Sequence, residues 1–235
     1  MRQHRRVYSN QLYAKLKKHD PQLQLVRLGC SGETTQTMIN GGICSYSQGS
    51  QLAAAEAFLR AHRGEVRYVT LDIGANDVDG CATAAGLNAA CAEQGVATVA
   101  KQLPQIAAAV HRAGGFGPQY VGMTYYDPFL AAWLTGTTGQ EVAHASVQLS
   151  TSFNEAITQG LHDADYQVAD VAKGFATDNF TTQVNVPGLG ELPENVARIC
   201  EWTWECTPYQ NIHANDTGYG EIAKVFARTL RHHHR

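Results

Sequence analysis

Short apolar segments alternate with helix-like segments along this chain, and this alternation limits the possible folds more than any other feature. Val66–Ile73 is the clearest strand, because it is rich in apolar and β-branched residues and is followed by Gly74. Three further segments have a strand-like pattern, namely Leu23–Leu28, Tyr120–Thr124 and Tyr166–Val171. Strands separated by helices pair in parallel and are covered by those helices. The sequence therefore predicts an α/β fold with a parallel sheet, and its 235 residues suit a single domain over residues 1–235.

The segments between these strands carry apolar residues at helical spacing. Ser50 is the expected N-cap of a helix with an apolar stripe formed by Leu52, Ala55 and Leu59. Pro104 indicates either a bend in one long helix or a boundary between two shorter ones. The other expected helices are Val7–Leu16, Val96–Val110, Val142–Leu161 and Asp216–Leu230, and Thr181–Pro193 is predicted to be a loop.

Charge and hydropathy exclude several functions. The formal net charge is −3, so no basic surplus attracts nucleic acid, which is not an expected partner. No apolar run reaches the roughly 18 residues that a transmembrane helix needs. Met1–Arg6 is basic but precedes no apolar stretch, so the given chain contains no readable signal peptide.

The six cysteines form three couples that are local in sequence. Closing a short loop costs little entropy, so the expected disulfides are Cys30–Cys44, Cys81–Cys91 and Cys200–Cys206. A zinc site is the weaker alternative, because no close couple such as C-x-x-C occurs. Free structural thiols are the other alternative. Three disulfides would indicate a secreted or extracellular protein.

Polar residues cluster directly after three of the predicted strands, where open parallel sheets place their chemistry. These segments are Gly29–Thr35, Gly74–Asp77 and Tyr125–Pro128. An asparagine amide beside a glycine N–H can stabilise an oxyanion, and a histidine can supply the base. The pattern indicates acyl transfer to water.

Three blocks have the order and spacing of a known family: Gly32 in Gly-Cys-Ser-Gly-Glu-Thr-Thr, Asn76 in Gly-Ala-Asn-Asp, and His213 in Ile-His-Ala-Asn-Asp. The chain thereby resembles the SGNH, or GDSL-type, ester hydrolases, in particular the disulfide-bearing secreted bacterial esterases and lipases. The resemblance implies a flavodoxin-like three-layer α/β/α fold. It also implies that Gly32 N–H and the Asn76 amide form part of an oxyanion hole, with His213 as general base. Taken singly, the three residues also fit a turn glycine, a loop cap and a helix cap.

Two features depart from the family pattern. The acid that normally precedes the histidine by three residues is Gln210 here, so its backbone carbonyl is the expected partner of His213 Nδ1, with Asp216 as the alternative. No Gly-Asp-Ser block, which carries the family's nucleophile, occurs in the chain. We expect the chain to begin late relative to the family and to lack the first, central strand. Ser31 is the alternative nucleophile, although it also fits a turn hydroxyl.

The sequence predicts hydrolysis of carboxylic esters by a serine acyl-enzyme mechanism. The alternative is an inactive homologue that binds an acyl or glycan ligand. Tyr126 and Trp204 are candidates for the substrate pocket, because turns or a disulfide loop would position them. We expect no cofactor and no metal, and a small-molecule or lipid ester as substrate. The protein should be a monomer if complete and prone to associate if truncated.

Overall fold

The computed structural model describes residues 7–83 and 86–231. Contacts between residues cluster in two compact units, and neither unit is continuous in sequence. Within the described residues, unit 1 comprises 7–25, 125–151 and 170–231, and unit 2 comprises 26–83, 86–124 and 152–169. One boundary falls inside the long helix α5 (Thr137–His162), whose first part is counted with unit 1 and whose second part with unit 2. The single domain expected from chain length stays a prediction.

Unit 2 contains a parallel sheet with the strand order β1-β4-β5. Its strands are β1 (Tyr68–Leu71), β4 (Gln119–Met123) and β5 (Gln167–Ala169). β4 is central and pairs in parallel with both neighbours. The structure thus confirms an α/β protein with a parallel sheet, and three of the four predicted strands.

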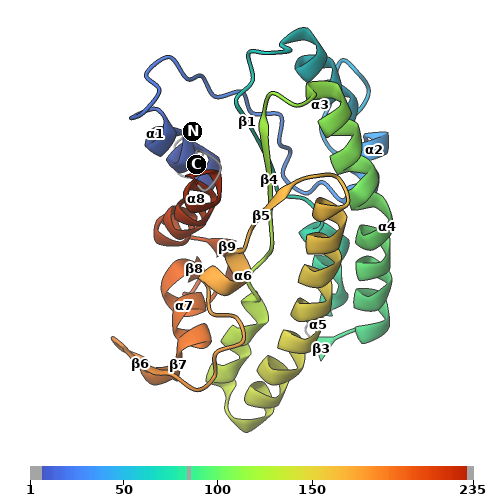
Figure 1. The fold of residues 1–235 in the computed structure, drawn as a ribbon. Coiled ribbons are helices and arrows are strands. Elements are labelled where there is room, and N and C mark those ends of the chain that lie inside the picture. Colours follow the sequence, from blue (N-terminus) through green and yellow to red (C-terminus); the bar gives the residue numbers. More distant parts are fainter. Residues whose placement is uncertain (1–6, 84–85, 232–235) are drawn as a thin grey trace. The chain divides into compact units, whose positions relative to one another are not determined.

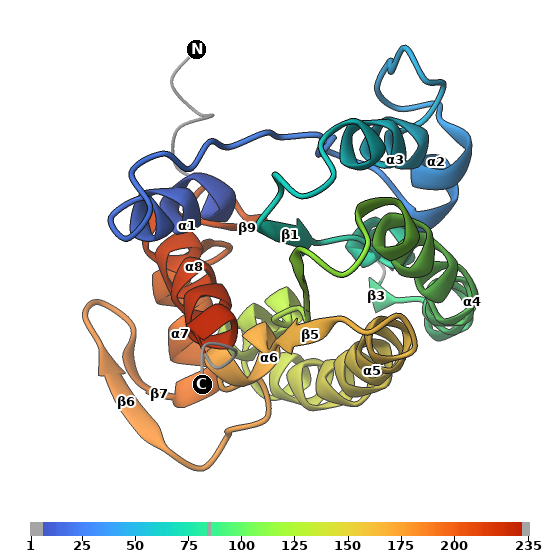
Figure 2. The same cartoon turned by 45° about the horizontal axis from the view of Figure 1, so that its top comes forward.

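Helices of unit 2 cover one face of this sheet. They are α2 (Thr35–Asn40), α3 (Gln51–Ala61), α4 (Ala89–Gly114) and the second part of α5. In both views α3, α4 and α5 lie on the same side of the strands (Figure 1 and Figure 2). Gly122 of β4 makes room for α5, because an added Cβ there would come within 2.4 Å of the Leu161 side chain. Between β1 and α4 lie η2 (Ala75–Asp77), η3 (Asp79–Cys81) and the short pair β2 (Ala82–Thr83) and β3 (Gly86–Leu87).

Local signals explain two of these helices. Ser50 caps α3 as predicted, since its hydroxyl accepts a hydrogen bond from Ala53 N at 3.1 Å. Pro104 lies inside α4, so the alternative of two shorter helices is wrong. A proline removes one backbone donor from a helix and adds a bulky ring. The ring is accommodated by Gly160 of α5, where an added Cβ would come within 3.2 Å of Pro104 Cδ.

Unit 1 is built around the packing of α1 (Tyr8–Leu16) on α8 (Asp216–Arg231). Tyr8 stacks on Phe226 with ring centroids 4.9 Å apart. The two helices lie side by side (Figure 1). They confirm the predicted first and last helices. The remaining elements are η4 (Pro128–Thr135), α6 (Val171–Gly174), β6 (Gln183–Val186), β7 (Gly190–Pro193), α7 (Glu194–Trp202), β8 (Thr203–Trp204) and β9 (Asn211–Ala214).

The strand predicted at Leu23–Leu28 is wrong. This segment has no regular secondary structure and belongs to none of the sheets within the described residues. A strand needs a neighbour to satisfy its backbone donors and acceptors, and apolar pattern alone supplies none. Without a place in a sheet, two of its apolar side chains face solvent, since Leu25 is 38 % and Val26 52 % exposed.

The loop predicted at Thr181–Pro193 is also wrong in part. β6 and β7 form an antiparallel hairpin in which Val184 lies opposite Leu192. Pro187 and Gly188 resemble a loop in sequence, and they form the turn that joins the two paired strands.

The three predicted disulfides are present. Their Cα atoms are 6.1 Å apart in Cys30–Cys44, 5.4 Å in Cys81–Cys91 and 4.8 Å in Cys200–Cys206. All six cysteines are used, which indicates an oxidising, non-cytoplasmic compartment. Within residues 7–83 and 86–231, no helix combines the length and apolar character needed to cross a membrane.

Replacing Cys30 and Cys44 together with serine should lower the free energy of unfolding. The cysteines are 14 positions apart, and the chain-entropy model assigns about 3 kcal/mol to a loop of this size. Urea unfolding under non-reducing conditions measures the difference. Peptide mapping without reductant is the companion control, and a crossed pairing would contradict the assignment.

Candidate functional site

Two blocks that the sequence analysis assigned to one site lie together in unit 2. The Asn76 side chain donates from Nδ2 to the Glu33 carbonyl at 2.9 Å. The neighbouring Asp77 carboxylate accepts two bonds from Thr35, at 2.8 Å from the backbone N–H and at 2.7 Å from the hydroxyl. The structure therefore brings the Gly32 block and the Asn76 block side by side.

Asn76 and Gly32 both remain accessible in this arrangement. Both residues are exposed. A primary amide carries two N–H donors, so the bond to Glu33 fixes the Asn76 side chain and leaves the second donor for another acceptor. Gly32 has φ +87°, a conformation in which glycine is the favoured residue. The turn role and the donor role of Gly32 are compatible, because the first concerns its φ angle and the second its N–H.

The Asp77 carboxylate links the two blocks from a partly buried position, which disfavours its charged form. Burial raises the pKa of its carboxyl, and the hydrogen bonds from Thr35 lower that pKa without cancelling the effect of burial. The Glu33 side chain is buried as well, and within the described residues neither of its carboxylate oxygens has a hydrogen-bond partner. The cross-links from Asn76 and Asp77 help to offset this local cost.

Gly95 allows α4 to approach the turn that carries Asn76 and Asp77. A Cβ added to Gly95 would lie 2.4 Å from the Asp77 carbonyl oxygen, which is backbone and cannot rotate away. Only a residue without a side chain fits this contact. The position of Asn76 therefore depends on a glycine of a neighbouring helix that no motif identifies.

Gly95→Ala should destabilise the protein, against the usual preference for alanine in helices. Forcing a methyl group into a tight contact costs about 1–3 kcal/mol. Urea unfolding should show a loss of this size. Gly220→Ala in α8 is the matched control, because a Cβ added there would meet only the flexible end of the Gln11 side chain, at 3.1 Å. A Gly95→Ala protein as stable as the parent would contradict the close approach.

His213 belongs to unit 1 and lies on β9. Thr203 of β8 pairs with Ala214, and Trp204 pairs with Asn211, so the two residues between them, Ile212 and His213, form an irregularity in the ladder. Bulges of this kind redirect side chains. The His213 side chain is accordingly exposed.

The partner of the His213 ring differs from the prediction. Nδ1 lies 2.8 Å from Asn211 Oδ1, and the His213 backbone N–H donates to the same oxygen at 2.9 Å. The contact predicted for the Gln210 carbonyl, or for Asp216, is thus made by Asn211. Gln210 instead has φ +42° and donates its N–H to Thr207 O at 3.0 Å, which turns the chain into β9.

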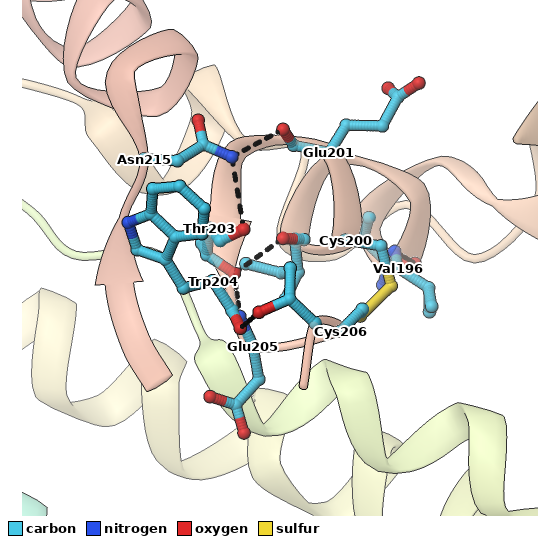
Figure 3. Close-up of a disulfide and its surroundings, with 11 residues drawn as sticks. Val196, Cys200, Glu201, Thr203, Trp204, Glu205, Cys206 and Asn215 are labelled. Atoms are coloured by element: carbon cyan, nitrogen blue, oxygen red, sulfur yellow. Dashed lines mark hydrogen bonds between the residues drawn. A yellow bond between two sulfur atoms is a disulfide. The ribbon is translucent and has the colours of Figure 1, made fainter. Parts of the chain in front are cut away.

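Asn215 joins the Cys200–Cys206 loop to the start of α8 (Figure 3). Its Nδ2 donates to Glu201 O at 2.8 Å and to Thr203 O at 3.1 Å. Its Oδ1 accepts hydrogen bonds from the N–H groups of Thr217 and Gly218. Asn215 is therefore the N-cap of α8, the role that the sequence analysis considered for His213. An asparagine directly before a helix is the signal that could have identified it.

The two predicted pocket residues have different surroundings. Tyr126 stacks on Phe175 and donates its hydroxyl to Ile212 O at 2.8 Å, so it supports the strand that carries His213. Trp204 is 41 % exposed and meets Tyr209 edge to face. An open cavity of about 590 Å³ lies in unit 2, and neither residue lines it. Its walls include Leu28, Tyr46, Phe58 and His62.

Asp127 is a buried acid that the sequence analysis noted only as part of a polar turn. Its Oδ1 accepts from Phe129 N at 2.9 Å, and its Oδ2 accepts from the Ser146 hydroxyl at 2.6 Å. Burial raises the pKa of Asp127 to about 6, although both hydrogen bonds oppose the rise. The residue caps η4 and ties it to α5 within unit 1.

This raised pKa predicts a stability that falls as pH rises. The folded protein holds the Asp127 proton more tightly than the unfolded chain, so ionisation between about pH 4 and pH 6 favours unfolding. The rise in the pKa of Asp127 from 3.8 to about 6 corresponds to at most about 3 kcal/mol in the free energy of unfolding. We expect Asp127→Asn, which keeps the shape, to lack this loss. Unfolding free energies at pH 4 and pH 7 measure it, and parallel profiles for the two proteins would contradict it.

Among the described residues, no group of three or more His, Cys, Asp or Glu side chains is placed to hold a metal ion. No family model matches the chain, and neither does any curated protein or solved structure.

Proposed function

We propose that this protein hydrolyses carboxylic esters, as a secreted member of the flavodoxin-like SGNH type. The observation that supports this best is the hydrogen bond from Asn76 Nδ2 to Glu33 O, which holds an exposed amide beside the Gly32 turn. An amide fixed in this way suits a developing oxyanion, because it needs no reorganisation when the charge forms.

In the proposed reaction, Gly32 N–H and the Asn76 amide donate to the carbonyl oxygen of the ester as it becomes negative. His213 Nε2 accepts the proton of the attacking group and passes it to the departing alcohol. In the family that the chain resembles, the attacking group is a serine of a Gly-Asp-Ser block, which these 235 residues do not contain. Within the chain the candidates are water and the exposed Ser31. Small-molecule or lipid esters are the proposed substrates.

The absence of a Gly-Asp-Ser block from the sequence favours a second candidate function. In this alternative the chain binds an acyl or glycan ligand without turning it over. Binding and turnover differ in their dependence on His213, because only turnover requires a proton acceptor.

Hydrolysis of p-nitrophenyl acetate and butyrate tests the proposal. Triad enzymes that lose their nucleophile keep only about 10³–10⁴-fold catalysis over water. We therefore expect slow hydrolysis above the buffer rate. His213→Ala should lower this rate, because the attacking water then has no proton acceptor, and Asn76→Ala should lower it by about 10²-fold or more. His62→Ala is the matched control for His213, and Asn40→Ala is the matched control for Asn76. Both control side chains have partners close in sequence, namely Glu65 and Gln36.

The outcomes separate the candidates. Rapid hydrolysis that Ser31→Ala abolishes would make Ser31 the nucleophile of the same ester hydrolase. A rate equal to buffer, with an acyl or glycan ligand still bound, would reject hydrolysis by this chain and leave the binding function.

A further inference from the structure

The backbone on both sides of His213 is held in place. On one side the carbonyl of Ile212 accepts the Tyr126 hydroxyl at 2.8 Å. On the other side Asn215 joins the start of α8 to the disulfide loop. The place of the His213 backbone within unit 1 is thus fixed. What decides its chemistry is which ring nitrogen carries the proton.

The contacts of Asn211 determine which ring nitrogen of His213 carries the proton. The His213 backbone N–H can only donate, so the Asn211 atom 2.9 Å from it must be the amide oxygen and not the amide nitrogen. The same oxygen lies 2.8 Å from His213 Nδ1. An amide oxygen cannot donate, so a hydrogen bond at this distance requires the proton on Nδ1. The neutral ring then has an unprotonated Nε2.

We propose that Asn211 is a positioning residue that holds His213 in the Nδ1–H tautomer, with Nε2 free to accept a proton. This inference rests on the proposed function only for the use of Nε2 as a base. The tautomer itself follows from the contacts of Asn211. Without such a partner, a histidine side chain in water favours the opposite, Nε2–H tautomer.

An uncharged partner changes the chemistry of the histidine. A carboxylate fixes the tautomer and also stabilises the imidazolium that forms when the base takes up a proton. An amide oxygen performs the first task but carries no charge for the second. Asn211→Asp should therefore keep the tautomer and strengthen the base.

Nitrogen NMR of the histidine rings tests the proposal on the full ¹⁵N-labelled chain at a pH where the rings are neutral. We expect a protonated nitrogen shift at Nδ1 of His213 and an unprotonated shift at Nε2. In Asn211→Ala the protonated shift should move to Nε2, and in Asn211→Asp it should stay at Nδ1. His62, whose Nδ1 faces Glu65 at 3.0 Å, is the internal control and should not change.

Two results would overturn the inference. One is a parent protein with the proton mainly on Nε2 of His213, a measurement that requires no variant to fold. The other is a folded Asn211→Ala protein, verified by an unchanged His62 signal and circular dichroism, whose His213 shifts match the parent. Ester hydrolysis enters only as a second readout, where Asn211→Ala should lower kcat with little change in KM. If the parent shows Nδ1–H but no hydrolysis, the proposed function fails and the tautomer assignment stands.

Discussion

Hydrogen bonds from side chains to loop backbone hold the segments on which the candidate chemistry depends. The parallel sheet has three short strands, so the residues beyond its ends gain no ladder bonds from it. Buried and half-buried backbone groups still need partners. Asp77 supplies one to Thr35, and Asn76 supplies one to Glu33, across more than forty positions of sequence. Together with the packing of α4 against the Asp77 turn, these bonds define the separation of the two loops of unit 2.

Hydrogen bonds from a side chain to the backbone also hold unit 1 together, but here the side chain is uncharged. Asn215 employs both ends of its amide, donating to two carbonyls of the disulfide loop and accepting from two N–H groups of α8. Because this amide need not be ionised, it is not subject to the cost that burial imposes on Asp77. A disulfide lies next to each of these clusters, which shortens the free loop that the hydrogen bonds must order.

The sequence predicts most of the regular elements, because their signals are local. The Ser50 cap of α3 and the apolar stripe of α8 require no knowledge of distant residues. Leu23–Leu28 fails for the opposite reason, since its pattern says nothing of whether a neighbouring strand exists. Pro104 is tolerated within α4 because Gly160, far along the chain, leaves space for its ring.

The candidate site divides in the same way. Asn76 and His213 are identifiable from short blocks, and the structure gives each a well-defined set of partners. Asn211 carries no motif, because its role appears only when β9 bulges and both the N–H and the ring of His213 meet one oxygen. The role of Gly95 likewise cannot be predicted from the sequence, since it depends on the close approach of the Asp77 carbonyl.

The contact between α1 and α8 has a consequence for the order of folding. Tyr8 finds its stacking partner, Phe226, only when almost the whole described chain has left the ribosome. Closing so long a loop is slow, because its entropy must be lost before the contact forms. Unit 1 therefore cannot complete its fold before α8 has been synthesised, so α1 lacks its packing partner while most of the described chain is being made.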